Sequence, residues 1–244
     1  MARRQAELKL NGGLSAGQDV PGWQKRSVER SLQGARLRAQ ERSDRFVTAA
    51  LELIVERKAS EFTIQDVVDR SGMSPRTFYT FFDGKESLML AIYETIMSKS
   101  VVPILTERLG HTSDPVLRLK ALIDAMFDVT SDPAPLARAL TVFHLRLAES
   151  RPQDLAQALE PFGRLLTDLL EGVAQAGLLR EDLDLRAMSA LIRELLLASA
   201  HKGVLADHRD VTAADMWAFC SAAIVRRSEA PACMPPADES PAEA

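Results

Sequence analysis

The sequence predicts an all-α protein with an N-terminal three-helix helix-turn-helix head and a C-terminal helical bundle. Apolar residues recur at intervals of three and four along most of the chain, and no alternating strand pattern is present. Near the N-terminal side, two short helical segments are separated by a tight glycine turn. The 244 residues are 46% hydrophobic, which suffices for a substantial core in one or two domains.

The first helix of the head is predicted over about residues 38–58. Six apolar residues give it one hydrophobic face: Phe46, Val47, Ala50, Leu51, Ile54 and Val55. The preceding residues 1–37 contain Gly12, Gly13, Gly17, Pro21 and Gly22 and few periodic apolar positions. We therefore expect residues 1–37 to form a flexible basic arm.

The second and third head helices are predicted from their start signals. Thr63-Ile64-Gln65-Asp66 resembles a capping box, in which a hydroxyl accepts from N–H groups of the first turn. Ser71-Gly72-Met73 ends that helix, and Ser74-Pro75 supplies an N-cap followed by proline at the first helical position.

A fourth helix is predicted to begin at Asp83, as its N-cap, and to run to about Val101, where Pro103 ends it. Further amphipathic helices are predicted over 115–131, 134–149, 153–176, 184–205 and 212–228. The domain division is then an arm at 1–37, a head at 38–90, a helical body at 91–228 and a disordered Pro- and Ala-rich tail at 229–244.

Charge is distributed unevenly along the chain, whose net charge is −4. Ten basic and five acidic side chains give residues 1–45 a charge of +5, against −2 for residues 46–90 and −7 for the remainder. A polyanionic partner should therefore meet the N-terminal side. Cys220 and Cys233 form no CxxC pair, so neither a disulfide framework nor a zinc site is expected. The absence of a long apolar run predicts a cytoplasmic protein.

The helix that begins after Ser74 carries the main functional prediction. At 100° per residue, Ser74, Phe78 and Phe81 fall on one side, and Pro75, Arg76, Tyr79 and Thr80 on the other, with Thr77 at the edge. The aromatic side is expected to pack inward, and the polar side suits phosphates and base edges in a DNA major groove. The start of the helix at Thr63 and the charge of Lys85 are expected to contact phosphates.

Residues 45–88 resemble the DNA-binding head of the tetracycline-repressor (TetR) family. The segments that carry the resemblance are Ala49-Ala50, Thr63-Ile64, Ser71-Gly72-Met73-Ser74, Thr77-Phe78-Tyr79, Phe81-Phe82 and Lys85-Glu86-Ser87-Leu88. The resemblance implies a homodimeric, all-helical regulator, by default a repressor, that binds a palindromic operator and releases it when a small ligand binds the body. It also implies that Thr63, Pro75, Arg76, Thr77, Tyr79, Thr80 and Lys85 contact DNA.

The DNA-binding set also includes Ser74, Arg42 and Arg45. Arg36, Arg38 and Arg42 either reach an adjacent minor groove or belong to a solvated charged helix, and the sequence leaves both interpretations open. Two departures from the family pattern are the long N-terminal arm and Ala59-Ser60, where the family often has glycine.

The body is expected to provide a dimer interface and an effector pocket. Two late helices are apolar on more than one side, so they are predicted to pair with their copies about a two-fold axis. The predicted interface comprises Ile192, Leu195, Leu196, Trp217, Cys220 and Ile224. The candidate pocket residues for a hydrophobic or amphipathic effector are Met126, Phe127, Phe143, His144, Phe162 and Leu166, although such a stripe also fits plain core.

Two other classes of protein remain as alternatives. An enzyme is disfavoured because the sequence has no HExxH motif, glycine-rich phosphate loop, nucleophile elbow or metal-spaced His/Cys set, and no metal or cofactor is expected. The second alternative is a helical small-molecule carrier or partner-binding protein that no longer binds DNA. The polar residues Arg76, Thr77, Tyr79 and Lys85 argue against it.

Overall fold

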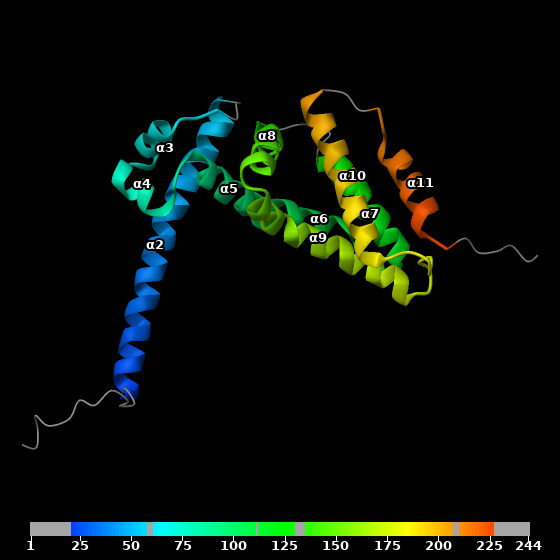
Figure 1. Ribbon diagram of the computed structural model, residues 1–244, viewed down its shortest axis with the longest axis horizontal. Helices are drawn as coiled ribbons and strands as arrows, with labels where there is room; N and C mark the ends of the chain where they lie inside the picture. Colours follow the sequence, from blue (N-terminus) through cyan, green and yellow to red (C-terminus); the bar gives the residue numbers. More distant parts are fainter. Residues whose placement is uncertain (1–20, 58–60, 111, 130–134, 207–209, 227–244) are drawn as a thin grey trace, which may run out of the picture. The chain divides into compact units, whose positions relative to one another are not determined.

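A computed structural model describes residues 21–57, 61–110, 112–129, 135–206 and 210–226. These residues form helices joined by turns, with one isolated β-bridge, which confirms the all-α fold class for the described part of the chain (Figure 1). The chain divides into two compact units, residues 1–45 and residues 46–244.

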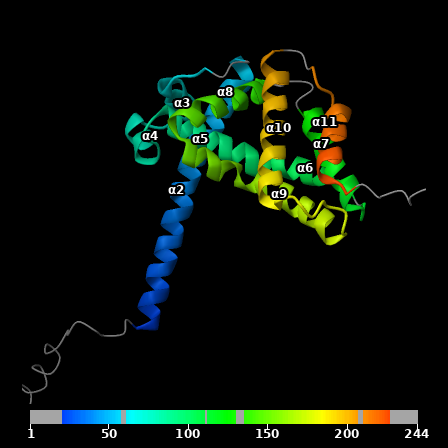
Figure 2. The ribbon, with the colours of Figure 1, turned by 45° about the vertical axis from the view of Figure 1, so that its right-hand side comes forward.

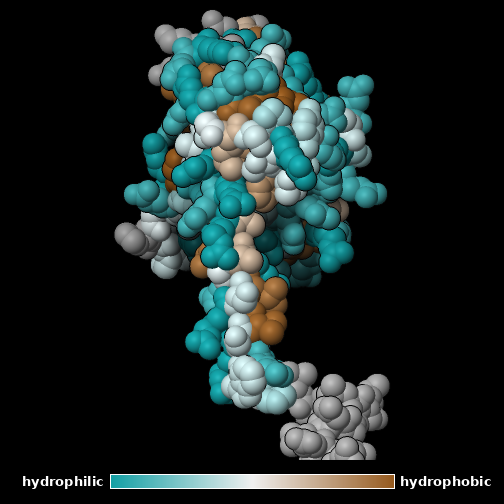
Figure 3. All heavy atoms as spheres, turned by 90° about the vertical axis from the view of Figure 1, so that its left-hand side faces the viewer, coloured by the Kyte–Doolittle hydropathy of each residue, from teal (hydrophilic) through white to brown (hydrophobic). Residues whose placement is uncertain are grey.

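Helix α2, Gly22–Arg57, begins well before the predicted start near residue 38. The predicted arm is therefore wrong for residues 22–37, whereas residues 1–20 lie outside the described residues. The prediction relied on apolar periodicity, but this segment is rich in good helix formers and can be helical while exposed. Trp23, Val28, Leu32 and Leu37 are all exposed, and hydrophobic atoms lie among hydrophilic ones on this helix (Figure 3).

The core of the head is aromatic. It lies among the Phe46–Arg57 part of α2, α3 (Ile64–Ser71) and α4 (Pro75–Phe81). The Phe46 ring meets the rings of Phe78 and Phe82 edge-on, at centroid distances of 5.4 and 6.1 Å. Such contacts bury large areas and fix the angle between helices.

Both predicted start signals of α3 and α4 are confirmed. Thr63 caps α3 in a capping box with Asp66, and the Ser74 hydroxyl accepts from the Thr77 N–H at the start of α4. Between them Gly72 has a φ of 66°, a left-handed conformation that favours glycine.

Helix α5, Lys85–Ile96, corrects two predictions. Its N-cap is the extended Gly84 without a side-chain cap, and Asp83 instead pairs with Arg151. Pro103 does not end the helix either, because a π-helical segment η1, Met97–Val101, leads into α6, Val102–Arg108. Proline is tolerated in the first turn of α6, where the Val102 N–H already bonds five residues back to the Met97 carbonyl.

The body helices lie close to their predicted ranges: α7 (Pro115–Val129), α8 (Pro135–Ser150), α9 (Pro152–Gln175), α10 (Leu185–Leu205) and α11 (Ala213–Ile224). Helix α9 packs against α7, α8 and α10, and α11 packs against α7 (Figures 1 and 2). An antiparallel bridge between Leu179 and Val225 ties the α9–α10 turn to the end of α11. Residues 227–244, which include most of the predicted tail, lie outside the described residues.

The stretch Lys85–Arg108 is long and apolar enough to cross a membrane. Its apolar side chains at Leu88, Ile92 and Leu105 are fully buried against other helices of the protein. A helix in the core of a folded protein can be equally long and apolar. We therefore interpret Lys85–Arg108 as a core segment.

Candidate nucleic-acid interface and interior cavity

The outward face of α4 carries the predicted DNA-contacting residues. Pro75, Arg76, Tyr79 and Thr80 are exposed, and 60% of Tyr79 is accessible. Phe78, on the opposite side, is completely buried. The side of the head turned to the viewer in Figure 3 is largely hydrophilic. Helix α4 therefore presents a guanidinium, a phenol and a hydroxyl on one exposed face.

One detail of the inward face differs from the prediction. Phe81 is only half-buried, whereas Phe82, the C-cap residue of α4, is buried and packs on Phe46 and Phe78. The chain leaves the helix at Phe82 in an extended conformation, so the helical spacing no longer gives the direction of that side chain.

Most hydroxyls near this face already have partners in the head. Thr63 Oγ1 donates to the Asp66 carboxylate at 2.7 Å, and Ser74 Oγ lies 2.8 Å from Thr77 Oγ1. Thr80 Oγ1 donates to the Arg76 carbonyl at 3.0 Å. Among the described residues, none forms a hydrogen bond or ion pair with the Arg76 guanidinium, so this exposed side chain is available to an external partner.

Other cations of the head are held by carboxylates. Arg57 makes a bidentate contact with Asp66, at 3.0 and 2.8 Å, and Arg70 makes one with Glu56, at 2.7 and 2.6 Å. The Arg57 guanidinium and the Thr63 cap hold the pKa of Asp66 well below its usual range. These pairs brace α2 against α3 and leave Arg57 and Arg70 less suited to phosphate contact.

Lys85 lies at the start of α5, and its Nζ is 4.8 Å from the centroid of the Phe62 ring. Burial lowers the pKa of Lys85, and the nearby Arg146 lowers it further. The ring of Phe62 also meets Phe143 of α8 edge-on, at 6.2 Å. Lys85 thus stands where head and body touch, and its contact with phosphate stays a prediction.

Arg42 and Arg45 belong to the first unit, on α2, and both are exposed. Their part in DNA binding also stays a prediction. The turn with Ala59-Ser60 lies outside the described residues.

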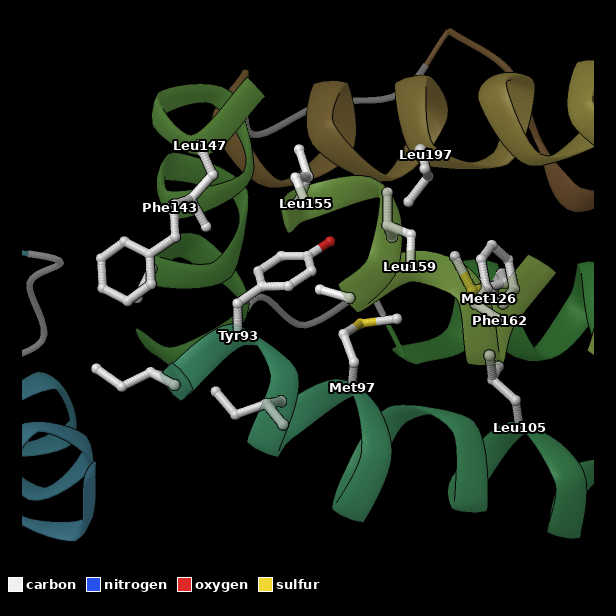
Figure 4. Close-up of a cluster of buried hydrophobic side chains, with 14 of the residues drawn as sticks. Tyr93, Met97, Leu105, Met126, Phe143, Leu147, Leu155, Leu159, Phe162 and Leu197 are labelled. Carbon is white, nitrogen blue, oxygen red and sulfur yellow. The ribbon is translucent and has the colours of Figure 1, made fainter. Parts of the chain in front are cut away.

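The body contains a partly open cavity of about 90 Å³ with a mostly apolar wall. Of the predicted pocket residues, Met126 and Phe162 line it. Phe127, Phe143 and Leu166 are buried in the surrounding core, and His144 lies behind the wall. The predicted pocket set left out Tyr93, Met97, Thr141 and His201, which line the cavity from α5, η1, α8 and α10. Figure 4 shows Tyr93 and Met97 pointing from neighbouring turns into this interior.

Two polar residues of the wall, Tyr93 and His201, form a cluster with His144, which lies behind the wall. The Tyr93 hydroxyl lies 3.1 Å from His144 Nδ1, and the His144 and His201 rings are 4.4 Å apart. Burial and the neighbouring His144 lower the pKa of His201 to about 4, and burial lowers that of His144. Burial also raises the pKa of Tyr93. All three groups are therefore neutral near pH 7.

The predicted dimer interface is wrong in most of its residues. Ile192, Leu196, Cys220 and Ile224 are at most 3% exposed within a single chain, so they form its core and are not available to a second copy. Trp217 is half-buried against the same core. Of the predicted interface residues, only Leu195 is exposed. Leu191 and Phe219, which the prediction left out, are exposed as well.

The outward polar face of α4, anchored by Phe78, lies within residues 46–92, which match the family model described as bacterial regulatory proteins, tetR family. Residues 46–92 therefore match the TetR family. Curated relatives support this assignment. The chain is 30% identical over 105 residues to the HTH-type transcriptional activator FasR of Mycolicibacterium smegmatis, and this match covers 43% of this chain and 48% of that protein. The chain is also 24% identical over 121 residues to the HTH-type transcriptional regulator BetI of Brucella anthropi. This match covers 50% of this chain and 61% of BetI.

The matches span 48% and 61% of the length of these two relatives, and both relatives are named as transcription regulators. Solved structures share the fold over more of the chain. The fatty acid degradation regulator FadR from Bacillus halodurans superposes with a TM-score of 0.55 at 21% identity, over 73% of this chain and 91% of that one. NemR from E. coli superposes with a TM-score of 0.57 at 16% identity, over 75% of this chain and 97% of the NemR chain.

Proposed function

We propose that this TetR-family chain is a sequence-specific DNA-binding transcription regulator, acting as a repressor, that leaves a palindromic operator when a small hydrophobic or amphipathic effector binds the body. The observation that carries the proposal is the two-sided construction of α4. Phe78 is fully buried, while Arg76 and Tyr79 stand exposed on the opposite side.

Helix α4 has the size and the surface needed to enter a major groove. An α-helix fits that groove, and a guanidinium can bond two acceptors of a guanine edge. Because Arg76 is free of protein partners among the described residues, a contact with a base breaks no existing ion pair. Thr63, at the start of α3, and Lys85, at the start of α5, supply the adjacent phosphate contacts.

The cavity between α5, η1, α7, α8, α9 and α10 is the proposed effector site. Its wall is mostly apolar, which favours a hydrophobic effector with few polar groups. One solved structure of this fold, FadR from Bacillus subtilis, is described as a complex with stearoyl-CoA. The present cavity of about 90 Å³ is small, so we infer either a compact effector or a cavity that widens on binding.

The proposed homodimer uses the apolar side chains that the single chain leaves exposed. Leu191 and Leu195 lie on α10, and Phe219, which is 63% exposed, lies on α11. Burial of this surface against a second copy would place two α4 helices on successive major grooves, about 34–36 Å apart. A regulator that binds the chromosome acts in the cytoplasm.

Selection of genomic DNA fragments by the purified full chain tests the proposal. The wild-type protein should enrich fragments that share a palindromic sequence. Arg76→Ala should weaken binding to that sequence by about 1–3 kcal/mol and relax the preference at one base position in each half-site. Arg164→Ala, which removes an exposed arginine from α9, is the matched control and should bind as the wild type does. Enrichment of no sequence by the wild type would contradict the proposal.

A further inference from the structure

Three polar side chains from three helices meet at one end of the apolar cavity. Tyr93 comes from α5, His144 from α8 and His201 from α10, and Tyr93 and His201 line the cavity directly. The rest of the wall is formed mainly by aliphatic and aromatic side chains, Met126 of α7 and Phe162 of α9 among them. The titratable groups of the wall are therefore concentrated in this cluster, and the remaining polar side chain, Thr141, donates its hydroxyl hydrogen to the Ala137 carbonyl.

The three side chains are not equivalent. Tyr93 and His144 share a hydrogen bond of 3.1 Å. The His201 ring contacts His144 at 4.4 Å between centroids and makes no hydrogen bond to any other residue that the structure describes. His201 is thus the member of the cluster with hydrogen-bonding capacity left for a molecule in the cavity.

The surroundings of His201 contain few charged groups, and none of them is bonded to its ring. Its neighbours Tyr93 and His144 are neutral near pH 7, and α7 and α9 present apolar side chains. The negative charge of Glu194, on the same helix, acts on both histidines and partly offsets the lowering of their pKa values by burial, and this carboxylate is paired with Arg193 at 3.1 Å. No described acidic side chain forms a hydrogen bond or ion pair with the neutral His201 ring, so a carboxylate in the cavity would meet no competing partner there and would stabilise the protonated form of the ring.

We propose that the effector is a small apolar carboxylate, and that His201 binds its carboxylate group and takes up one proton from solvent as it does so. This inference rests on the effector cavity of the proposed function. The proton is added to the neutral imidazole of His201, and the imidazolium then donates a charge-assisted hydrogen bond to the carboxylate oxygen, with no covalent bond made or broken. His144 accepts or donates the hydrogen bond with Tyr93. This hydrogen bond orients the His144 ring next to His201.

The same cluster connects the effector to the head. Tyr93 belongs to α5, and the first residue of this helix, Lys85, lies over Phe62 at the head. A change in the position of His201 and His144 therefore acts on the helix that runs from the cavity to the head.

Hexanoate and 1-hexanol form a matched pair of probes, since they share an alkyl chain length and differ in charge. Calorimetry of the full chain in buffers of different ionisation enthalpy should show that the protein takes up close to one proton when hexanoate binds. The affinity for hexanoate should fall several-fold, by up to about tenfold per pH unit, between about pH 6 and pH 8. The affinity for 1-hexanol should stay constant over this range.

The variant His201→Gln should weaken hexanoate binding by about tenfold or more, remove its proton uptake and leave 1-hexanol binding unchanged. Lys202→Gln is the matched control, because it changes an exposed neighbour on the same helix that pairs with Asp210. An NMR titration of the wild-type histidines adds a readout that needs no variant. The His201 signal should report a neutral ring at pH 7 without ligand and a protonated ring with hexanoate.

Three results would overturn the inference: no binding of hexanoate, equal and pH-independent affinities for the two probes, or proton uptake that persists in His201→Gln. The third result would mean that the protonated acid binds without help from His201. Operator binding measured without any probe, in the same preparations, separates this inference from the proposed function. Intact operator binding without a hexanoate response overturns the inference alone.

Discussion

The guanidinium of Arg151 lies 2.5 Å from the carboxylate of Asp83. This ion pair joins the turn between α4 and α5 to the start of α9, where Arg151 also reaches Asp154 at 3.4 Å. The Arg151 guanidinium holds the pKa of Asp83 below its usual value. Head and body are therefore connected by a charged contact directly after the proposed DNA-reading helix.

Asp83→Asn and Arg151→Gln test this connection. Because the pair is largely exposed, we expect each variant to change the melting temperature only slightly. Operator affinity should change in both, and the double variant should resemble the single variants, since the two residues act as a unit. Fluorescence anisotropy with operator DNA measures the affinity of the wild type, the two single variants and the double variant. Effects on affinity that add in the double variant would show that the pair does not link α9 to the head.

Phe78→Ala and Tyr79→Ala separate anchoring from DNA contact. The Phe78 side chain is fully buried between Phe46 and Phe82, so its removal should cost about 3–5 kcal/mol of stability. Tyr79 is mainly exposed, so Tyr79→Ala should fold as the wild type does and lose operator affinity. Urea unfolding and operator binding measure the two quantities. A Tyr79→Ala variant with unchanged affinity would remove the phenol from the DNA-contact set.

Lys85→Met tests the phosphate contact without disturbing the packing on Phe62. Methionine keeps an aliphatic stem over the ring and removes the charge. Affinity for all DNA sequences should fall alike, and the slope of log affinity against log salt concentration should decrease by about 1. Lys120→Met, on α7, is the control and should leave the slope unchanged. An unchanged slope in Lys85→Met would assign this lysine to the head–body contact only.

Leu191→Glu and Phe219→Glu should produce folded monomers with poor operator binding, since both residues are exposed in the single chain. Ile192→Glu, one position along α10, should instead destabilise the fold, because Ile192 is 3% exposed and a buried unpaired charge is costly. Analytical ultracentrifugation and circular dichroism distinguish the two outcomes. Dimers that persist in Leu191→Glu and Phe219→Glu would place the interface elsewhere.

Stability should fall as the pH is lowered through the range in which unfolded histidine protonates. The folded-state pKa of His201, about 4, lies below its unfolded value near 6.5, so the unfolded chain binds more protons between these values. The contribution of His201 is therefore fully present above about pH 6.5 and is lost towards pH 4. Thermal unfolding should show a weaker pH dependence in His201→Gln than in Lys202→Gln. Identical profiles in these two variants would contradict the low pKa.

The head was predictable from the sequence because its signals are local. The Thr63 capping box, the Ser74-Pro75 start and the opposite faces of Phe78 and Arg76 each depend on residues within a turn or two of helix. Asp83 shows the limit of this reasoning. Its sequence context suits an N-cap, but a partner 68 residues away, Arg151, holds its carboxylate.

The body was predictable in its helices but not in their faces. Helix α10 is apolar on several sides, so its sequence does not show whether Ile192 or Leu191 faces the core. The arrangement of α9 and α7 around it decides this. The cluster of Tyr93, His144 and His201 escaped prediction for a related reason, since its members come from three helices far apart in the sequence.

The π-helical segment Met97–Val101 keeps one wall of the cavity straight. In a regular α-helix, residues four apart advance by about 40° beyond a full turn, so a row of them winds around the axis. In the wider π turn, four residues fall short of a full turn, which reverses this drift. Tyr93, Met97 and Val101 consequently follow one another along the same side and all line the cavity. Deletion of a single residue within this segment would restore regular winding and turn Tyr93 and Val101 away from a common line.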